Sequence, residues 1–253
     1  MKIYLGFDDT DVLDSLYGTG KLVRWFQRQL PDGCQCIGVV RQQLLVCRDI
    51  PYTSHNSSAC LIAEIPEPDL LDDIIQRAVA HLRHYAVQGS DPGLCVAAEF
   101  DASLNRLAEF GYLCTREVAA QRQAMDAAGQ AHLSGHGGTN DGIIGAAAAV
   151  GLTVSGWAGR FIEFGDLRNL PEEMWVGDLR KMGIDVVSMD RDAKVPAPDD
   201  VVITNGWLRP RLLGHLPVLL VNPTESGVWQ NVYRKRKKRK DLLEKHEPIK
   251  AIP

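Results

Sequence analysis

Alternating apolar and polar blocks along the chain predict both strands and helices. The first apolar run, at residues 3–7, is typical of a buried strand. Leu22, Phe26 and Leu30 then recur at helical spacing until the turn signal at 31–33 ends the pattern. Further apolar runs predict strands at 36–40, 44–47 and 59–65. The expected fold class is therefore α+β.

The middle of the chain has the pattern of a split β-α-β unit of ferredoxin-like size. The strand at 59–65 is followed by an amphipathic pattern at 70–82, a strand-like run at 94–100 and a second helical pattern at 104–108. A strand or a helix follows at 113–124. We therefore predict a ferredoxin-like module at 59–133.

Beyond this module the pattern predicts a smaller α/β region. A helix of small residues at 142–151 leads into it. The expected elements are a strand at 154–164, a helix at 170–182, strands at 184–188 and 201–204, and a β hairpin at 207–222.

Three carboxylates, Asp8, Asp9 and Asp11, follow the first apolar run within four residues. A strand that ends there delivers clustered negative charge to one point, which water or a divalent cation must neutralise. Carboxylate oxygens suit Mg²⁺, and ligand sites of open α/β sheets gather beyond the carboxyl ends of strands. The sequence therefore predicts a magnesium site, with a solvated turn that caps the next helix as the alternative.

Two glycine-led helix starts provide possible anion sites. Gly18, Gly20 and Lys21 flank Thr19 where the first helix begins, and a glycine-rich stretch at 137–142 precedes the helix of small residues. Free N–H groups and the dipole at a helix start attract phosphate, and glycine permits close approach of a ligand. The first stretch lacks the residues of a P-loop. The second could be a glycine-rich loop that only connects two elements and binds no ligand. Together with the acidic cluster, however, they predict binding of a nucleoside triphosphate.

A polar segment at 53–58 between two predicted strands is longer than a hairpin turn needs. It is an ordinary exposed loop or a source of neutral donors for a ligand, with Arg48 just before it. The predicted nucleotide-binding residues are Gly18, Gly20, Arg48, Gly137, Gly138, Thr139, Asn140, Asp141 and Gly142.

Composition narrows the class of protein. The chain of 253 residues is 45% hydrophobic and 24% charged, as expected of a globular protein. No apolar run is long enough to span a membrane, and no secretory signal pattern precedes the first strand. Six cysteines lack C-x-x-C spacing, which favours reduced core residues over a zinc site. We therefore expect a cytoplasmic protein that does not bind a membrane.

The charge of the chain is unevenly distributed. The net charge is −4, yet residues 234–240 carry seven positive charges, which leaves −11 for the rest. Such a run is a solvated tail or a nonspecific phosphate-binding strip for RNA or DNA. Aromatic residues between 207 and 233 offer surfaces on which bases could stack, although packing is the alternative role.

With these motifs assembled, the sequence resembles the archaeal tRNA-isoleucine agmatinylcytidine synthetase family. The G-x-D-D-T-D motif of that family stands at 6–11, its threonine-containing helix start at 18–20, and its G-x-I-G-A-x-A-A-x-G helix at 142–151. A further family segment is echoed by Arg48, Pro51, Tyr52 and Ala59. The resemblance covers about residues 1–155.

The chain departs from the family in three respects. Val12 replaces a serine, and residues 54–57 replace a T-R-G-N sequence and lose its arginine. The chain is also too short for the OB-fold and zinc ribbon of that family. The resemblance therefore supports a nucleotide site more strongly than it supports the family's tRNA and agmatine substrates.

The resemblance implies a kinase-like nucleotide-binding α/β core at 1–58 and 134–160, with the ferredoxin-like module inserted and a small C-terminal α/β region at 161–253. It implies ATP and Mg²⁺ as cofactors, with Asp8, Asp9 and Asp11 as metal ligands. Asp8, Asp9, Thr19 and Lys21 are the predicted catalytic residues, and Thr19 occupies the position of the family's phosphate-accepting threonine.

Three functions stay open at this point. The first is an ATP- and Mg²⁺-dependent phosphotransferase or ligase whose acceptor the sequence does not name. The second is a noncatalytic RNA-binding or regulatory module that uses the basic C-terminal segment. The third is a ligase for a small carboxylate or amine that involves no nucleic acid.

Overall fold

The computed structural model describes residues 1–50, 52–53, 55–232. The basic run at 234–240 and Tyr233, with the RNA-binding role predicted for them, lie outside the described residues. No helix in the described part of the chain combines the length and apolar character needed to cross a membrane.

The described strands form one 12-stranded sheet in which antiparallel pairs predominate. The order is β5-β4-β1-β3-β2-β6-β10-β11-β12-β9-β7, with β8 paired to β11. The strands of the N-terminal half are β1 (Lys2–Asp8), β2 (Gln35–Gln43), β3 (Ser57–Glu64), β4 (Gly93–Ala98), β5 (His132–Gly135) and β6 (Arg160–Glu163).

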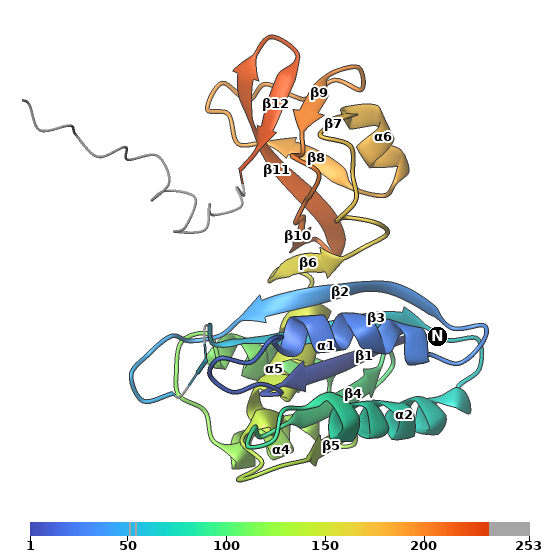
Figure 1. The fold of residues 1–253 in the computed structure, drawn as a ribbon, viewed down its shortest axis with the longest axis vertical. Helices are drawn as coiled ribbons and strands as arrows, with labels where there is room; N and C mark the ends of the chain where they lie inside the picture. The colour runs from blue at the N-terminus through green and yellow to red at the C-terminus, as the bar shows by residue number, and fades with distance from the viewer. Residues whose placement is uncertain (51, 54, 233–253) are drawn as a thin grey trace, which may run out of the picture.

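Helices cover both faces of the N-terminal half of the sheet (Figure 1). One face carries α1 (Thr19–Phe26), extended by a 3₁₀ turn at Gln27–Gln29, and α2 (Leu70–Tyr85). The other carries α3 (Leu104–Leu113), α4 (Gln121–Ala128) and α5 (Gly142–Val154). Alternation along β1 builds both cores, since Ile3, Leu5 and Phe7 pack with α1 and α2 while Tyr4 faces the α5 side.

The C-terminal half extends the same sheet beyond β6. Its elements are β7 (Glu173–Trp175), α6 (Val176–Lys181), β8 (Asp185–Ser188), β9 (Val201–Ile203), β10 (Arg211–Leu213), β11 (Leu216–Glu225) and β12 (Val228–Asn231). A third core lies here, and it includes Val40, Ile62 and Phe161 from the N-terminal half. The two halves meet at the pairing of β6 with β10, a narrow junction in Figure 1.

The α+β class is confirmed, and several predicted elements differ in extent. Residues 44–47 form a loop rather than a strand, because the backbone N–H of Leu45 donates to the carbonyl of Cys114 instead of to a neighbouring strand. The predicted helix at 170–182 contains β7 before α6, and β5 and β12 were not predicted. All six cysteines are free, and Cys60, Cys95 and Cys114 are buried.

The sheet runs across the predicted domain boundaries. The strand β1 of the predicted core lies between β3 and β4 of the predicted module, and the boundary at 58 falls inside β3. The kinase-like core and the inserted ferredoxin-like module therefore stay predictions about how this continuous sheet is divided.

Candidate functional site

The register of the sheet brings distant parts of the sequence to the end of β1. Asp8 lies opposite Gly93 of β4, and Gly93 lies opposite Gly135 of β5. Because β4 is antiparallel to β1, the turn before β4 sits beside the acidic cluster. The glycine-rich loop that follows β5 begins at the same edge.

Small residues let α5 pack closely on β1. A Cβ atom at Gly6 would overlap the carbonyl oxygen of Ala146, and one at Gly145 would overlap the carboxylate of Asp8. Both glycines therefore permit a contact that a larger residue would block. The acidic turn and the first turn of α5 are neighbours, as the sequence predicts.

A cavity of about 580 Å³ opens where these segments converge. Its acidic lining residues come from several segments of the chain: Asp8, Asp9, Asp11, Asp49, Asp91, Glu117 and Asp141. Thr19, Thr53, Ser57, Gly142 and Gly145 add small and hydroxyl groups. The described lining residues include no Lys or Arg, so the cavity is strongly acidic.

The concentration of carboxylates raises the pKa of two of them. Burial, followed by the nearby Asp9 carboxylate, raises the pKa of Asp8 to about 8. Burial, followed by Asp91 and Asp11, raises the pKa of Asp9 to about 6. Asp9 also adopts a φ of 49°, which is uncommon for a residue with a side chain and recurs at functional sites.

A hydroxyl network holds Asp11 and Thr19 together. The hydroxyl of Thr10 donates to Oγ1 of Thr19 over 3.0 Å, and Thr19 donates to Oδ1 of Asp11 over 3.5 Å. Thr53 donates to Oδ2 of Asp11 over 3.0 Å. Since Thr10 is 0% and Thr19 6% exposed, this network fixes Asp11 at the cavity wall.

Asp91 occupies the N–H groups of the glycine-rich loop. Its carboxylate accepts hydrogen bonds from the backbone N–H groups of Thr139, Asn140 and Asp141 over 2.8–3.0 Å. The loop therefore closes on an acidic side chain of the protein. The N–H groups that the sequence assigned to a ligand phosphate are engaged in this structure.

The structure brings only part of the predicted site to the cavity. Asp8, Asp9, Asp11, Thr19, Asp141 and Gly142 line it, whereas Gly18, Gly20, Lys21, Arg48, Gly137, Gly138, Thr139 and Asn140 do not. Gly137 packs on the Ser90–Pro92 segment, and Gly138 on Asp91. Glycine at these positions thus serves close approach between two segments of the chain.

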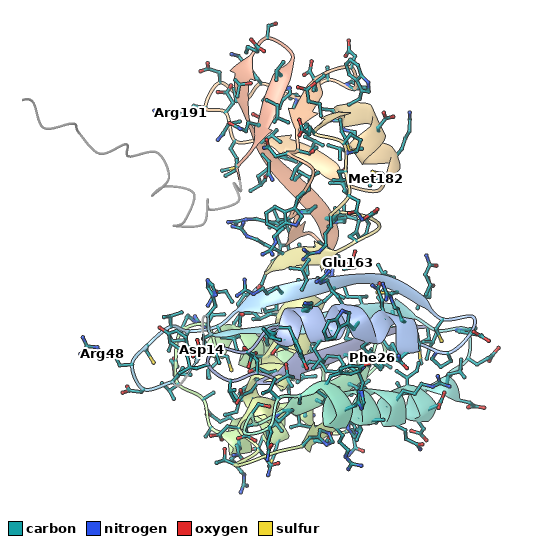
Figure 2. All side chains as sticks on the ribbon, viewed as in Figure 1. Asp14, Phe26, Arg48, Glu163, Met182 and Arg191 are labelled. Atoms are coloured by element: carbon teal, nitrogen blue, oxygen red, sulfur yellow. The ribbon has the colours of Figure 1, made fainter. Side chains whose placement is uncertain are left out.

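The two predicted cations point elsewhere. The ammonium of Lys21 lies 5.2 Å from the centre of the Trp25 ring. Arg48 is exposed at the far end of the β2–β3 loop (Figure 2). The sequence placed them near the acidic cluster by their order along the chain, whereas helical phase and loop length direct them away.

Sequence reasoning missed Thr10 and Asp91 as members of the site, and it included Thr53 only within the polar segment at 53–58. Thr10 lies inside the acidic motif, and a buried hydroxyl between carboxylates is a usable signal. Asp91 stands in an S-D-P-G turn immediately before a strand. Asp91 could be recognised as a site residue only from the antiparallel pairing of β1 with β4, which the local sequence pattern does not reveal.

A divalent cation bound in this cavity would need phosphate or water oxygens as ligands in addition to the carboxylates of the protein. No group of three or more His, Cys, Asp or Glu side chains among the described residues is arranged to hold a metal ion. Mg²⁺ usually takes one or two carboxylates and completes its shell with phosphate oxygens and water. Two of the three carboxylates of Asp8, Asp9 and Asp11 would meet that number, whereas the three together do not form a complete metal site in the described part of the chain.

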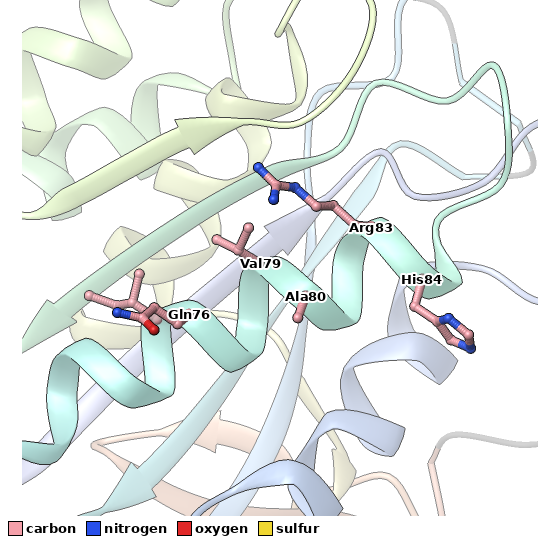
Figure 3. Close-up of a pocket in the computed structure, with 6 residues that line it drawn as sticks. Gln76, Val79, Ala80, Arg83 and His84 are labelled. Carbon is pink, nitrogen blue, oxygen red and sulfur yellow. The ribbon is translucent and has the colours of Figure 1, made fainter.

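A second hollow of about 510 Å³ lies on the outer face of α2 (Figure 3). Its walls come from this helix alone: Ile75, Gln76, Val79, Ala80, Arg83 and His84. Arg83 and His84 point away from one another, so no polar groups converge there. The cavity at the end of β1 is therefore the stronger candidate.

Solved structures with a similar fold belong to enzymes that act on tRNA. The complex of TiaS with its tRNA and ATP aligns with a TM-score of 0.51 at 22% identity, covering 60% of this chain and 36% of that chain. The fold is shared with part of TiaS. TiaS is an isoleucine-tRNA agmatidine synthetase, so the resemblance found in the sequence motifs is confirmed at the level of the fold.

Two further structures give the same result. The complex of TiaS with its tRNA, AMPCPP and agmatine aligns with a TM-score of 0.51 at 19% identity, covering 72% of this chain and 44% of that chain. A tRNA fluorescent labeling enzyme aligns with a TM-score of 0.51 at 23% identity, covering 60% of this chain and 36% of that chain. This chain thus spans less than half the length of these structures. Comparison with protein-family models and with curated proteins finds no match.

Proposed function

We propose that the chain is an ATP- and Mg²⁺-dependent phosphotransferase or ligase whose active site is the cavity at the end of β1. The observation that carries this proposal is the meeting of Asp8, Asp9 and Asp11 with the first turn of α5. These segments lie more than 130 residues apart in the sequence, and their convergence brings carboxylates beside a helix start in one concave site.

The charge of the cavity determines how a nucleotide enters it. A triphosphate is repelled by this lining, since the described lining residues offer carboxylates and no Lys or Arg. Asp8, Asp9 and Asp11 would hold Mg²⁺, which neutralises phosphate charge when bound. Phosphoryl transfer depends mainly on positioning and on charge neutralisation, and the hydrogen-bonded Asp11–Thr19 pair supplies a fixed geometry.

Thr19 would accept a phosphoryl group in this proposal, the role that the family resemblance implies for it. Its hydroxyl oxygen would bond to the γ-phosphorus as the bond to the leaving ADP oxygen breaks. The hydroxyl proton would pass to Oδ1 of Asp11, which already accepts the hydrogen bond from Thr19. The contacts from Thr10 hold Thr19 Oγ1 at the cavity wall.

RNA is the acceptor class that the similar structures support. Two of them hold TiaS with its tRNA, one with ATP and one with AMPCPP and agmatine. Because this chain covers under half of those proteins, the RNA acceptor is part of the proposal. A second candidate is ligation of a small amine, which the acidic lining of the cavity favours because it attracts a cation.

Isothermal titration of the whole protein with Mg·ATP tests the proposal. We expect binding that disappears with EDTA and in Asp8→Asn, while Asp126→Asn on the exposed face of α4 binds as the parent does. Absence of binding by a folded sample of the parent protein would contradict the nucleotide site.

ATP consumption separates the two acceptor classes. A mixed tRNA pool and a panel of diamines and guanidino amines are supplied separately and together. Consumption that requires RNA supports the first candidate, and consumption with amines alone supports the second.

A further inference from the structure

Three arginines stand directly opposite one another on three neighbouring strands. Arg41 of β2 pairs with Arg160 of β6, and Arg160 pairs with Arg211 of β10. Residues paired in this way share one face of the sheet. We call Arg41, Arg160 and Arg211 the arginine row. It crosses the junction between the two halves of the molecule.

The row lies on the face of the sheet that carries α1. Arg41 is opposite Ala59, and Arg160 shares its face with Ile162, while both Ala59 and Ile162 belong to the core beneath α1 and α2. A Cβ at Gly20 would come within 3.0 Å of Ile162, so the start of α1 sits against the same strand as Arg160.

One end of the row reaches the wall of the cavity. Nε of Arg41 donates to Oγ of Ser57 over 2.9 Å, and Ser57 lines the cavity. The other end, Arg211, is exposed on the C-terminal half. The row therefore leads from the C-terminal half to the candidate active site.

The row places three guanidinium groups of the same charge on neighbouring strands. One anionic group can attract two neighbouring guanidinium groups. A chain of phosphates that crosses these strands would therefore meet the row at each strand in turn.

We propose that the arginine row binds the phosphates of a nucleic-acid strand and guides that strand into the cavity. Guanidinium groups match phosphate geometry and stay charged at all relevant pH values. Neighbouring strands are about 4.8 Å apart, so the row presents positive charge over roughly 10 Å. It supplies a basic path toward a cavity whose own lining is acidic.

This surface is independent of the basic run at 234–240 and of nucleotide binding. The RNA acceptor in the proposed function predicts a contact surface without locating it, and the row gives that surface named residues. Failure of Mg·ATP binding would leave the row intact as a nucleic-acid site, and failure of the row would leave the nucleotide site intact.

Salt-dependent binding of labelled single-stranded RNA and DNA of the same sequence tests the row in the whole protein. Each phosphate contact contributes about −0.7 to the slope of log K against log salt for a single strand. We expect Arg160→Gln and Arg211→Gln each to make the slope shallower by about 0.7 and to weaken binding several-fold at low salt.

The matched control is Arg122→Gln, which removes the same charge from the exposed face of α4. It should change neither the slope nor the affinity. The exposed Arg211 is the variant least dependent on folding, and Mg·ATP titration of each variant reports on the integrity of the cavity.

Three results would overturn the proposal. The first is absence of RNA and DNA binding by the folded parent protein at low salt. The second is an unchanged slope in both row variants. The third is loss of all binding on deletion of 234–240 with no effect of the row, which assigns the contact to that segment. Comparing the affinities for RNA and for DNA of the same sequence shows whether the protein also recognises the ribose 2′-hydroxyl groups.

Discussion

At the scale of single residues, the candidate site is a set of carboxylates that the fold forces together. Asp8 faces Gly145 from the end of β1, and Asp9 is close to Asp91 and Asp11. The protein holds these groups at an energetic cost, as surplus charge in an active site commonly requires. Because of this cost, removing the charge of one carboxylate should change the free energy of unfolding by a measurable amount.

Removing the charge of Asp8 should stabilise the ligand-free protein above neutral pH. Burial and Asp9 raise the pKa of Asp8 from 3.8 to about 8, so between these values the folded state binds more protons than the unfolded state. The free energy of unfolding therefore falls as pH rises through this window. Thermal melts should show a shallower fall for Asp8→Asn than for the parent, with Tm higher by several degrees near the upper end of the window. Equal pH profiles would contradict the raised pKa.

Removing the charge of Asp91 should have the opposite effect on stability. Asp91→Asn weakens an acceptor of three backbone N–H groups of an exposed loop. Urea denaturation should show a loss of roughly 0.5–1.5 kcal/mol in the free energy of unfolding. Thr139→Val loses only the hydroxyl contact with Asp91 and should cost less. A larger loss in Thr139→Val would show that the hydroxyl, not the carboxylate acceptor, orders this loop.

At the scale of elements, α5 connects the stability of the fold to the site. Its glycines lie at distinct contacts, Gly145 against Asp8 and Gly151 against the carbonyl of Leu107 in α3. The helix is buried along most of its length, so it cannot shift toward solvent to relieve a clash. Close packing of α5 against its neighbours is therefore the main reason for its small residues, and ligand binding is an additional reason at Gly145.

Adding one methyl group at each position should separate these two roles. Gly145→Ala and Gly151→Ala should each lower the free energy of unfolding by about 1–3 kcal/mol, the usual cost of overpacking a core. Only Gly145→Ala should also weaken Mg·ATP binding, because its new Cβ displaces the Asp8 carboxylate. Denaturation and titration of both variants provide the comparison, and equal effects on Mg·ATP binding would contradict the assignment of Gly145 to the site.

At the scale of the whole molecule, one sheet unites two halves through a narrow junction. The third core is built mainly by the C-terminal half but contains Val40, Ile62 and Phe161. Hydrophobic contact as well as strand pairing therefore crosses β6. The arginine row follows the same junction, so its geometry depends on both halves holding their places.

Truncating Phe161 should weaken the coupling of the two halves. Phe161→Ala removes a ring that is 2% exposed and should lower the free energy of unfolding by about 3–5 kcal/mol. Hydrogen exchange should accelerate in β10 and β11 more than in β1. Phe100→Ala is the control, because Phe100 is 84% exposed and contributes little to the core. Uniform acceleration across the sheet would show that the halves unfold as a single unit.

The sequence by itself determined the elements around the site and the chemistry of its main residues. The apolar run that ends in Asp8, Asp9 and Asp11, and the glycine-led start of α5, are local patterns with local physical causes. Periodicity and turn chemistry predicted α1, α2, α3 and the β10–β11 hairpin for the same reason.

Only the tertiary structure decided which segments meet. The pairing of Asp8 with Gly93 brings Asp91 to the cavity and lets it take the loop N–H groups that the sequence assigned to phosphate. The pairing of β2, β6 and β10 aligns three arginines that lie 51 to 170 positions apart. Strand register depends on packing over the whole sheet, so no local window of the sequence contains it.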